Sequence, residues 1–344
     1  MKAVVFHEFG GSDTLRVEEL DDPTPGPGEV VLDVAACALN HLDVDVREGI
    51  SRFPIEPPHV LGLEVVGRIA EVGPGVEGWS VGDRVMPYLM DTCGQCRFCQ
   101  TGRESLCVSP GFISFVHSGG YAEQLACSAS QLISVPDEIG DVEAAALQIA
   151  FATAWHMLFA RGNLRTGETV VVNAVGSGIG SAAVQLAHLA GAYVIGTASS
   201  DDKLARASEL GMDAGINHTR QDVVGEVMRL TDERGADLVY EHCGGELFQK
   251  GLDSLSKDGR LVICGAHAGE VVEFDIIPFF RAQKSVIGSF VYTKSEVETC
   301  LELARRGKIV PLVHETHALE QAREAMDQME SRDFFGKIVL TPGG

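Results

Sequence analysis

The chain has 344 residues, of which 45% are hydrophobic and 39 are glycine. Its length suits two domains better than one, and its composition is ordinary for a globular α/β protein. Forty-nine acidic against 27 basic residues give a formal net charge of −22, and such a surface repels phosphate backbones, which argues against nucleic acid as a partner.

Hydropathy and charge also bear on location. No apolar run reaches the roughly eighteen residues that a membrane-spanning helix needs, and residues 1–6 lack the core of a signal peptide. We therefore expect a cytoplasmic protein without a membrane partner. Only eight of the basic residues are lysines. An acid-rich, lysine-poor surface suits a high-salt cytoplasm, although a protein of an ordinary cytoplasm can carry the same charge.

The first third of the chain has the pattern of a β-rich domain. Strand-like segments occur at residues 30–36, 60–67 and 81–85, and prolines punctuate the sequence between and around them.

A loop beyond these strands contains four cysteines, Cys93, Cys96, Cys99 and Cys107. Two-residue gaps let successive thiolates point to one centre, and the fourth completes a tetrahedron, so the spacing predicts a structural zinc site. A closed four-cysteine site holds a loop together and does not catalyse. Arg97 and Arg103 can offset its negative charge. An iron–sulfur cluster, two disulfides and free thiols are the alternatives.

From about residue 141 the sequence alternates between helix and strand. Residues 143–159 have helical periodicity, and apolar strands and helices then follow in turn, at 168–174, 181–189, 192–197, 203–210, 236–240 and 260–264. Apolar strands that alternate with helices predict a parallel, doubly wound sheet. Two further helices, at 295–306 and 319–330, and a strand at 337–340 end the chain.

The turn after the first of these strands has the composition of a phosphate-binding loop. Small residues let backbone N–H groups approach a pyrophosphate, and the start of a helix adds positive potential. The G-x-G-x-x-G pattern is incomplete, because Ser181 stands at its last position. We predict cofactor contacts from Gly176, Ser177, Gly178 and Ile179. The alternative is a tight turn without a ligand.

The end of the next strand bears on the choice between NAD and NADP. NAD enzymes usually carry an acid there for the ribose hydroxyls, whereas this chain has Thr197, Ser199 and Ser200, and its acids come later. Those side chains and Lys203 can receive a 2′-phosphate, so we predict NADP(H). Alternatively, Lys203 is an exposed residue in the first turn of a helix.

Together these motifs resemble the zinc-type medium-chain dehydrogenase/reductase superfamily, which includes alcohol dehydrogenases and quinone oxidoreductases. The resemblance covers nearly the whole chain, with further marks at residues 25–30, 75–85, 119–123 and 336–340. It implies an α/β protein. A GroES-like, β-rich catalytic domain would comprise residues 1–150 and 288–344, with the zinc lobe at about 91–108, and a Rossmann NADP-binding domain would comprise residues 151–287.

The resemblance places the three ligands of the family's catalytic zinc at Asn40, Leu63 and Ile149, and none of these side chains suits zinc. Without a Lewis acid, alcohol oxidation is difficult because nothing stabilises the alkoxide. An α,β-unsaturated carbonyl, an enoyl thioester or a quinone can accept a hydride without a metal, since hydrogen bonds can hold an enolate. The resemblance therefore implies NADPH-dependent reduction of such an acceptor.

The resemblance also suggests roles for single residues. Asn40 is a candidate oxyanion donor, His41 a candidate proton relay and Asp43 a candidate partner of His41. A turn brace, a surface histidine and a helix cap are the respective alternatives. Glu64 is expected to pair with a lysine near the carboxyl terminus. Further cofactor contacts are expected from Thr153, His218, Gly265, Phe290 and that lysine, Lys337.

Two other functions stay open at this point. One is a zinc-dependent alcohol or polyol dehydrogenase with an atypical metal site, and the other is an NADPH-binding protein without turnover. The favoured interpretation requires NADP(H), one structural Zn²⁺ per subunit and a small carbonyl or quinone substrate. It also suggests a homodimer or homotetramer.

Overall fold

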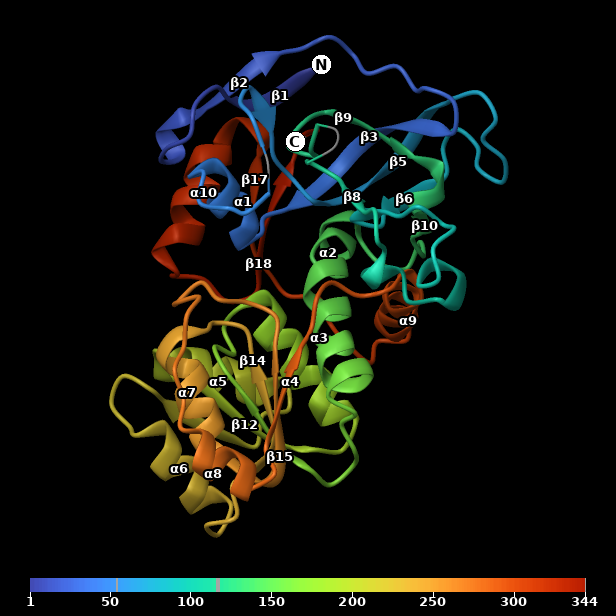
Figure 1. Cartoon of the computed structure of the whole chain (residues 1–344). Helices are drawn as coiled ribbons and strands as arrows, with labels where there is room; N and C mark the ends of the chain where they lie inside the picture. Colours follow the sequence, from blue (N-terminus) through green and yellow to red (C-terminus); the bar gives the residue numbers. More distant parts are fainter. Residues whose placement is uncertain (54, 116–117, 344) are drawn as a thin grey trace. The chain divides into compact units, whose positions relative to one another are not determined.

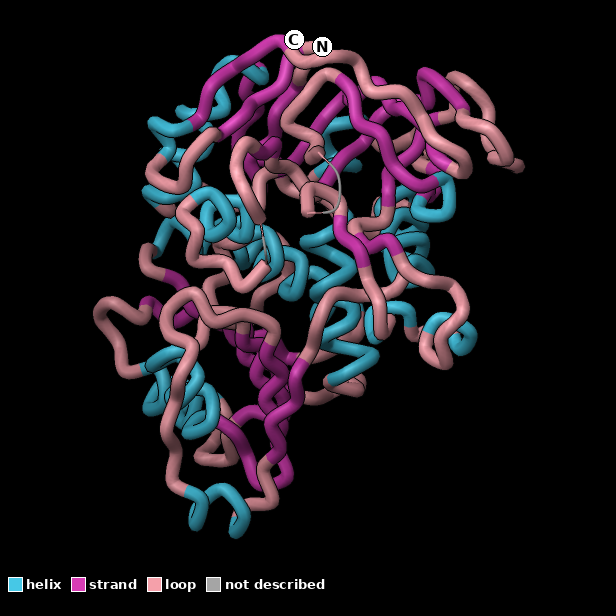
Figure 2. The backbone as a smooth tube through the Cα atoms, turned by 45° about the horizontal axis from the view of Figure 1, so that its top comes forward, coloured by secondary structure: helices cyan, strands magenta, loops and turns pink. Residues whose placement is uncertain are grey.

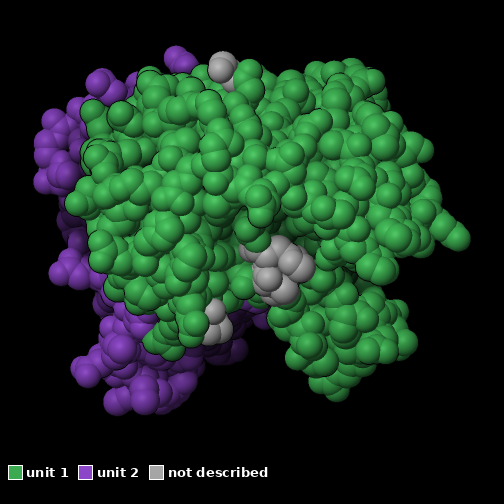
Figure 3. All heavy atoms as spheres, turned by 90° about the horizontal axis from the view of Figure 1, so that it is seen from above, with its two compact units in different colours: residues 1–148, 293–344 green, residues 149–292 purple. Residues whose placement is uncertain are grey.

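The computed structural model describes residues 1–53, 55–115 and 118–343 and divides the chain into two compact units. Unit 1 comprises Met1–Gln148 and Thr293–Gly344, and unit 2 comprises Ile149–Tyr292 (Figure 3). The second boundary lies beyond the expected residue 288, because β16 (Ser285–Gly288) belongs to the sheet of unit 2. No helix in the described ranges is both long and apolar enough to span a bilayer.

Unit 1 is mainly antiparallel β-structure (Figure 1). Its largest sheet has the order β10-β6-β5-β3-β18-β17, with β9 also against β3, and β2-β1-β4 and β7-β8 form two smaller sheets. The strands are β1 (Lys2–Phe6), β2 (Leu15–Glu19), β3 (Glu29–Ala38), β4 (His59–Val60), β5 (Glu64–Val72), β6 (Arg84–Pro87), β7 (Met90–Asp91), β8 (Gly111–Phe112), β9 (Gln124–Ser128), β10 (Leu132–Ser134), β17 (Val313–Ala318) and β18 (Lys337–Thr341).

Both ends of the chain build unit 1. Strand β18 runs antiparallel to β3, with Leu340 opposite Cys37, so a carboxyl-terminal strand completes an amino-terminal sheet. Residues buried on these two strands pack with α10 in one apolar core. The helices of the unit are α1 (His41–Arg47), α2 (Asp141–Ala145), α9 (Lys294–Arg305) and α10 (Ala322–Ser331).

The strand predicted at residues 60–67 is interrupted in the structure. It divides into β4 and β5 at Gly62, whose φ of +109° lies in the region that favours glycine. A Cβ there would stand 2.7 Å from the ring of Tyr121, so the close approach of Tyr121 requires glycine. The backbone N–H of Tyr121 donates to the carbonyl of Leu61. This close contact between distant segments ends β4 and starts β5 at Glu64.

Unit 2 confirms the predicted parallel sheet. Its strands have the order β13-β12-β11-β14-β15-β16, which is the order 3-2-1-4-5-6 of a dinucleotide-binding fold. The strands lie side by side between helices (Figure 2). The elements are α3 (Thr153–Trp155), β11 (Thr169–Val172), α4 (Gly178–Leu189), β12 (Tyr193–Ala198), α5 (Asp201–Glu209), β13 (Ala214–Asn217), α6 (Val223–Leu230), β14 (Ala236–Glu241), α7 (Gly245–Ser254), β15 (Leu255–Ile263), α8 (Ile276–Arg281) and β16.

The helix predicted at residues 143–159 is largely confirmed, but it is not one regular α-helix. The structure has α2 and then wide, π-type turns at Gln148–Ala152 and His156–Arg161 on either side of the short α3. The fully buried amide of Gln148 donates to the carbonyl of Pro87 and accepts from the N–H of Leu89. Periodicity within the segment could not reveal these tertiary bonds.

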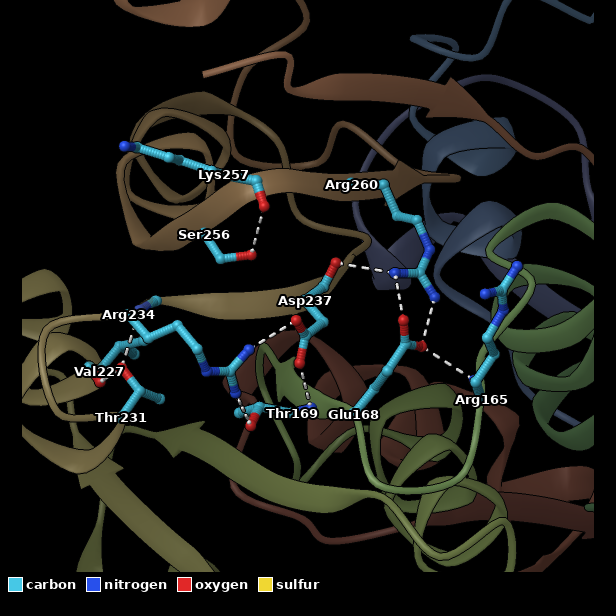
Figure 4. Close-up of polar contacts among 11 residues, drawn as sticks. Arg165, Glu168, Thr169, Val227, Thr231, Arg234, Asp237, Ser256, Lys257 and Arg260 are labelled. Atoms are coloured by element: carbon cyan, nitrogen blue, oxygen red, sulfur yellow. Dashed lines mark hydrogen bonds and ion pairs between the residues drawn. The ribbon is translucent and has the colours of Figure 1, made fainter.

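Polar side chains join the amino ends of the central strands of unit 2 (Figure 4). Arg260 of β15 makes a two-pronged contact with Glu168, with nitrogen–oxygen distances of 2.6 and 3.1 Å. Arg234 binds both Asp237 at 2.6 Å and Thr169 at 2.9 Å. The side chains at this edge of the sheet bind one another. A ligand is therefore expected at the opposite edge, at the carboxyl ends of the strands.

Candidate functional site

A buried polar cluster in unit 1 is centred on Asn40. The Asn40 amide donates to Glu64 Oε2 at 3.3 Å and to the carbonyl of Ala38 at 3.2 Å, and its oxygen accepts from Lys337 Nζ at 2.7 Å. Lys337 Nζ lies 3.0 Å from Glu64 Oε2. Strand β3 leads into Asn40, β5 begins at Glu64 and β18 begins at Lys337, so neighbouring strands of one sheet bring the three side chains together.

The pairing of Glu64 with Lys337 agrees with the sequence-based expectation, but the pair is not on the surface. Glu64 is fully buried and Lys337 is 7% exposed. The ammonium group also donates to the carbonyl of Leu39 at 2.6 Å. With Glu64, Asn40 and Leu39 as acceptors, all three of its hydrogens are used. The expected contact between Lys337 and a cofactor phosphate would therefore require this arrangement to change.

The Asn40 amide is also occupied, which changes its expected role. Both its nitrogen and its oxygen serve the Glu64–Lys337 pair, so the amide braces this cluster instead of standing ready as an oxyanion donor. The neighbouring His41 opens α1 and is partly exposed.

Asp43 lies beneath the start of α1 and is almost fully buried. Its Oδ2 accepts from the backbone N–H of Asn40 at 2.8 Å and from the hydroxyl of Tyr121 at 3.0 Å. The first bond fastens the first turn of α1, as a helix cap does. Burial raises the pKa of Asp43 to about 6, despite these donors. The geometry therefore supports the alternative reading of Asp43 as a capping residue.

The four cysteines of the predicted zinc lobe converge. Their sulfur atoms all lie within 4.8 Å of one another, with 3.5 Å between Cys96 and Cys99 and 4.0 Å between Cys93 and Cys99. Tetrahedral zinc with bonds of about 2.3 Å requires sulfurs about 3.8 Å apart. In the described part of the chain, no other group of three or more histidine, cysteine or acidic side chains is gathered closely enough to hold a metal.

Neighbouring groups act on the thiols and the charge of the lobe. A hydrogen bond from the backbone of Cys99 lowers the pKa of Cys96, whereas burial raises the pKa of Cys99. The guanidinium groups of Arg97 and Arg103 lie 4.5 and 5.2 Å from the ring centre of Phe98, which follows directly on Arg97. Two cations are thus held beside the cluster, as the sequence suggested, and they can offset the charge of four thiolates.

The glycine-rich turn in unit 2 has the expected form. The chain leaves β11 through Ala174, whose φ is +47°, and α4 then begins with Ser177 as its cap. Ser177 Oγ accepts from the N–H of Gly180 at 3.0 Å and donates to the carbonyl of Ala174 at 2.9 Å. A Cβ at Gly180 would lie 2.3 Å from that same carbonyl, so the tight approach of α4 to β11 requires glycine there. Gly176, Gly178 and Ile179 complete this turn.

A buried polar network beneath the turn was missed by the sequence analysis. Glu241, at the end of β14, accepts from the Asn173 amide and from the backbone N–H groups of Cys243 and Gly244. Thr197 Oγ1 donates to Asn173 Oδ1 and accepts from the N–H of Ala174, both at 3.2 Å. Thr197 is therefore a support of the turn in this arrangement, not an exposed cofactor contact.

The end of β12 carries a second group of polar residues. Ser200 caps α5 by accepting from the N–H of Lys203 at 3.3 Å, and Ser199 is exposed. Asp201 is paired with Arg220, and Asn217 donates to it at 2.8 Å. These bonds lower the pKa of Asp201. Arg220 is a cation near the predicted phosphate position that sequence reading missed, because it follows a different strand.

The remaining predicted residues are spread through unit 2. His218 follows β13 and is partly exposed, whereas Gly265 follows β15, where a Cβ would lie 2.3 Å from the carbonyl of His242. Thr153 opens α3, and Phe290 is 53% exposed beyond β16. His218 and Gly265 thus follow strands of the sheet whose carboxyl edge also carries the glycine-rich turn.

Comparison with known proteins identifies both halves of the chain. Residues 26–137 match the model of the alcohol dehydrogenase GroES-like domain, and residues 178–306 match the model of the zinc-binding dehydrogenase family. An alcohol dehydrogenase of Geobacillus stearothermophilus is 34% identical over 99% of this chain and 98% of its own length.

Solved structures extend the likeness. The structure of an NAD-dependent alcohol dehydrogenase is 39% identical, with a TM-score of 0.94 and 99% of each chain covered. A mycobacterial quinone oxidoreductase is 28% identical with a TM-score of 0.82, covering 99% of this chain and all of its own.

Proposed function

Because the chain belongs to the zinc-type alcohol dehydrogenase family of medium-chain dehydrogenases/reductases, with its GroES-like and Rossmann-type domains, we propose that it is a reductase that uses NADPH to reduce an activated carbonyl compound without a catalytic zinc. The acceptor class is an α,β-unsaturated carbonyl, an enoyl thioester or a quinone. The dinucleotide supplies a hydride when it is bound.

The observation that carries this proposal is the chemistry of the cluster around Asn40. Where relatives are expected to offer a thiolate and an imidazole, this chain has an amide engaged with Glu64 and Lys337 and the buried, apolar Leu63. Neither residue binds zinc. An acceptor that needs no Lewis acid therefore fits this site better than an alcohol does.

Hydride addition to the β-carbon of an enone places negative charge on the carbonyl oxygen. A donor must stabilise that charge and later supply a proton. Asn40 already uses its amide within the cluster, so we assign the proton-donating role to the adjacent, partly exposed His41. Asn40 is then a positioning residue that holds the start of α1.

Support for NADPH comes from the end of β12. No acid stands there for the ribose hydroxyls, and the first one along the chain, Asp201, is ion-paired with Arg220 and accepts a hydrogen bond from Asn217. Lys203 lies in the first turn of α5, after the exposed Ser199, and Arg220 brings a second cation whose charge is shared with Asp201. The relatives named NAD-dependent alcohol dehydrogenases leave NAD as the competing cofactor.

A second candidate is favoured by the names of the relatives. Many of them are called alcohol dehydrogenases, so an alcohol dehydrogenase with an unusual second metal site is the main rival. It predicts two zinc ions per chain, whereas the proposed reductase predicts one, in the cysteine lobe.

We also propose that the chain forms a homo-oligomer. Strand β16 is an edge strand of the sheet in unit 2, and the nearby α8 has no buried residue. Ile276, Ile277 and Phe280 are 54–67% exposed there, and such an apolar patch favours association. Light scattering should give a dimer or tetramer, and Ile277→Asp should lower that mass.

The proposed reaction is tested by NADPH oxidation at low and high KCl without added metal, with a small enone compared against its saturated ketone. We expect turnover of the enone alone, and a loss of roughly 10²-fold or more in His41→Ala. Asn40→Ala should lose less and should also unfold more easily. Equal reduction of the saturated ketone, together with two zinc ions per chain, would establish the rival function.

A further inference from the structure

His242 is a buried imidazole directly after β14 with one nitrogen in use and one not. The residue is 7% exposed. Its Nε2 lies 3.1 Å from Ser177 Oγ, the cap of α4. Its Nδ1 is buried and has no hydrogen-bond partner within the described ranges of the chain. A buried polar atom left in this way is costly unless a ligand or an ordered water satisfies it.

The bonds of Ser177 decide which nitrogen carries the hydrogen. Its hydroxyl hydrogen is given to the carbonyl of Ala174, and one lone pair accepts from Gly180. A hydroxyl has one donor and two acceptor sites. Ser177 Oγ can therefore only accept from His242, so Nε2 carries the hydrogen and Nδ1 carries a lone pair. Burial lowers the pKa of His242 to about 3, with the nearby His267 as a smaller cause, so the ring is neutral near pH 7.

The place of His242 in the sheet indicates which part of a dinucleotide it would meet. In this strand order the chain switches sides between β11 and β14, and the pyrophosphate of a dinucleotide lies at that point, over the start of α4. The predicted 2′-phosphate residues follow β12, on one side of β11. His242 follows β14, on the other side, which is the nicotinamide half.

We propose that His242 is a cofactor-binding residue whose Nδ1 accepts a hydrogen bond from a hydroxyl of the nicotinamide ribose. The inference rests on the proposed use of a nicotinamide dinucleotide by this same turn. A neutral acceptor suits a hydroxyl and does not suit a phosphate oxygen, which has no hydrogen to donate. Through Nε2 the same ring also holds Ser177, and with it the cap of α4.

Two substitutions separate the two nitrogens. Glutamine carries an amide N–H near the position of Nε2 and has no atom near that of Nδ1, so His242→Gln keeps the Ser177 contact and loses the acceptor. Asparagine places its amide oxygen near Nδ1, so His242→Asn keeps the acceptor and loses the Ser177 contact. Ser177→Ala removes the same contact from the other side and is the matched control.

The probes are ADP-ribose, which contains the second ribose, and ADP, which lacks it, each with and without an adenosine 2′-phosphate. Calorimetry with the full chain gives the Kd values, and thermal unfolding checks that each variant is folded. We expect His242→Gln to weaken ADP-ribose about tenfold and ADP less than twofold. His242→Asn and Ser177→Ala should weaken both ligands equally.

Equal effects of His242→Gln on both ligands, or no effect, would overturn the assignment and leave His242 as a support for Ser177. Should His242→Gln fail to fold, a loss of the preference for ADP-ribose in His242→Asn would overturn it as well. One outcome is that the unmodified chain oxidises NADPH with an enone even though His242→Gln affects ADP-ribose and ADP equally or not at all. In that case only the inference about His242 fails. If it binds no dinucleotide fragment, the proposed cofactor fails with it.

Discussion

Lys337 and Glu64 form an ion pair inside unit 1, with 3.0 Å between Nζ and Oε2 and side chains that are 8% and 0% exposed. Asn40 completes the cluster through both ends of its amide. A buried charge is stable only while its oppositely charged partner is present. The stability of unit 1 is therefore sensitive to the loss of either Glu64 or Lys337.

Removal of one charge should therefore destabilise unit 1 strongly. Lys337→Met leaves the Glu64 carboxylate buried without its cation, and we expect a loss of about 3–5 kcal/mol in the free energy of unfolding. The double variant Glu64→Leu/Lys337→Met removes both charges and should recover most of that loss. The control is Lys2→Met at the exposed pair with Glu320, where the change should stay below about 1 kcal/mol. Urea unfolding measures all of these, and a loss in Lys337→Met no larger than in the control would contradict the expectation.

The cysteine lobe should hold one zinc ion per chain. Elemental analysis of the purified protein is expected to give a zinc ratio near one, and Cys99→Ser should reduce it well below one because a tetrahedral site loses a ligand. Cys300 is a buried cysteine on α9 outside the lobe. The control variant Cys300→Ser should therefore contain as much zinc as the unmodified protein. Iron together with acid-labile sulfide in place of zinc would mean that the lobe binds an iron–sulfur cluster.

Asp43 should give stability a distinctive dependence on pH. Its pKa rises from 3.8 to about 6 on folding, with burial as the main cause. The folded state then binds more protons than the unfolded state between these values, so stability falls as pH rises through this window. The shift corresponds to about 3 kcal/mol. Asp43→Asn should lack this contribution while keeping an acceptor for Asn40 and Tyr121. The difference in unfolding free energy between the two proteins should change by about that amount between pH 4 and 7, and a constant difference would refute the assignment.

The cations beside the end of β12 should determine the preference for NADPH. Lys203→Ala and Arg220→Ala are expected to raise KM for NADPH roughly tenfold each, since a charge-assisted hydrogen bond to phosphate is lost. KM for NADH should change little. Arg229→Ala is the matched control, because Arg229 is an exposed arginine of α6 that pairs with Glu226. Parallel changes for both cofactors would show that these cations act on the fold of the loop and not on the 2′-phosphate.

The sequence by itself determined the features that depend on near neighbours in the chain. The spacing of Cys93, Cys96 and Cys99 places their sulfurs around one centre, and a strand followed by small residues makes the turn that Ser177 caps. The alternation of apolar strands with helices was enough to predict the parallel sheet of unit 2, because each period follows from local backbone geometry.

Only the tertiary structure decided the contacts that depend on strand pairing. Lys337 reaches Asn40 across 297 residues of sequence because β18 joins β3, and His242 meets Ser177 across 65 because β14 lies beside β11. The break at Gly62 depends on Tyr121, and the pairing of Asp201 depends on Arg220, which follows another strand. A side chain's partners, and therefore whether it is free for a ligand, are set by the register of segments that no local pattern brings together.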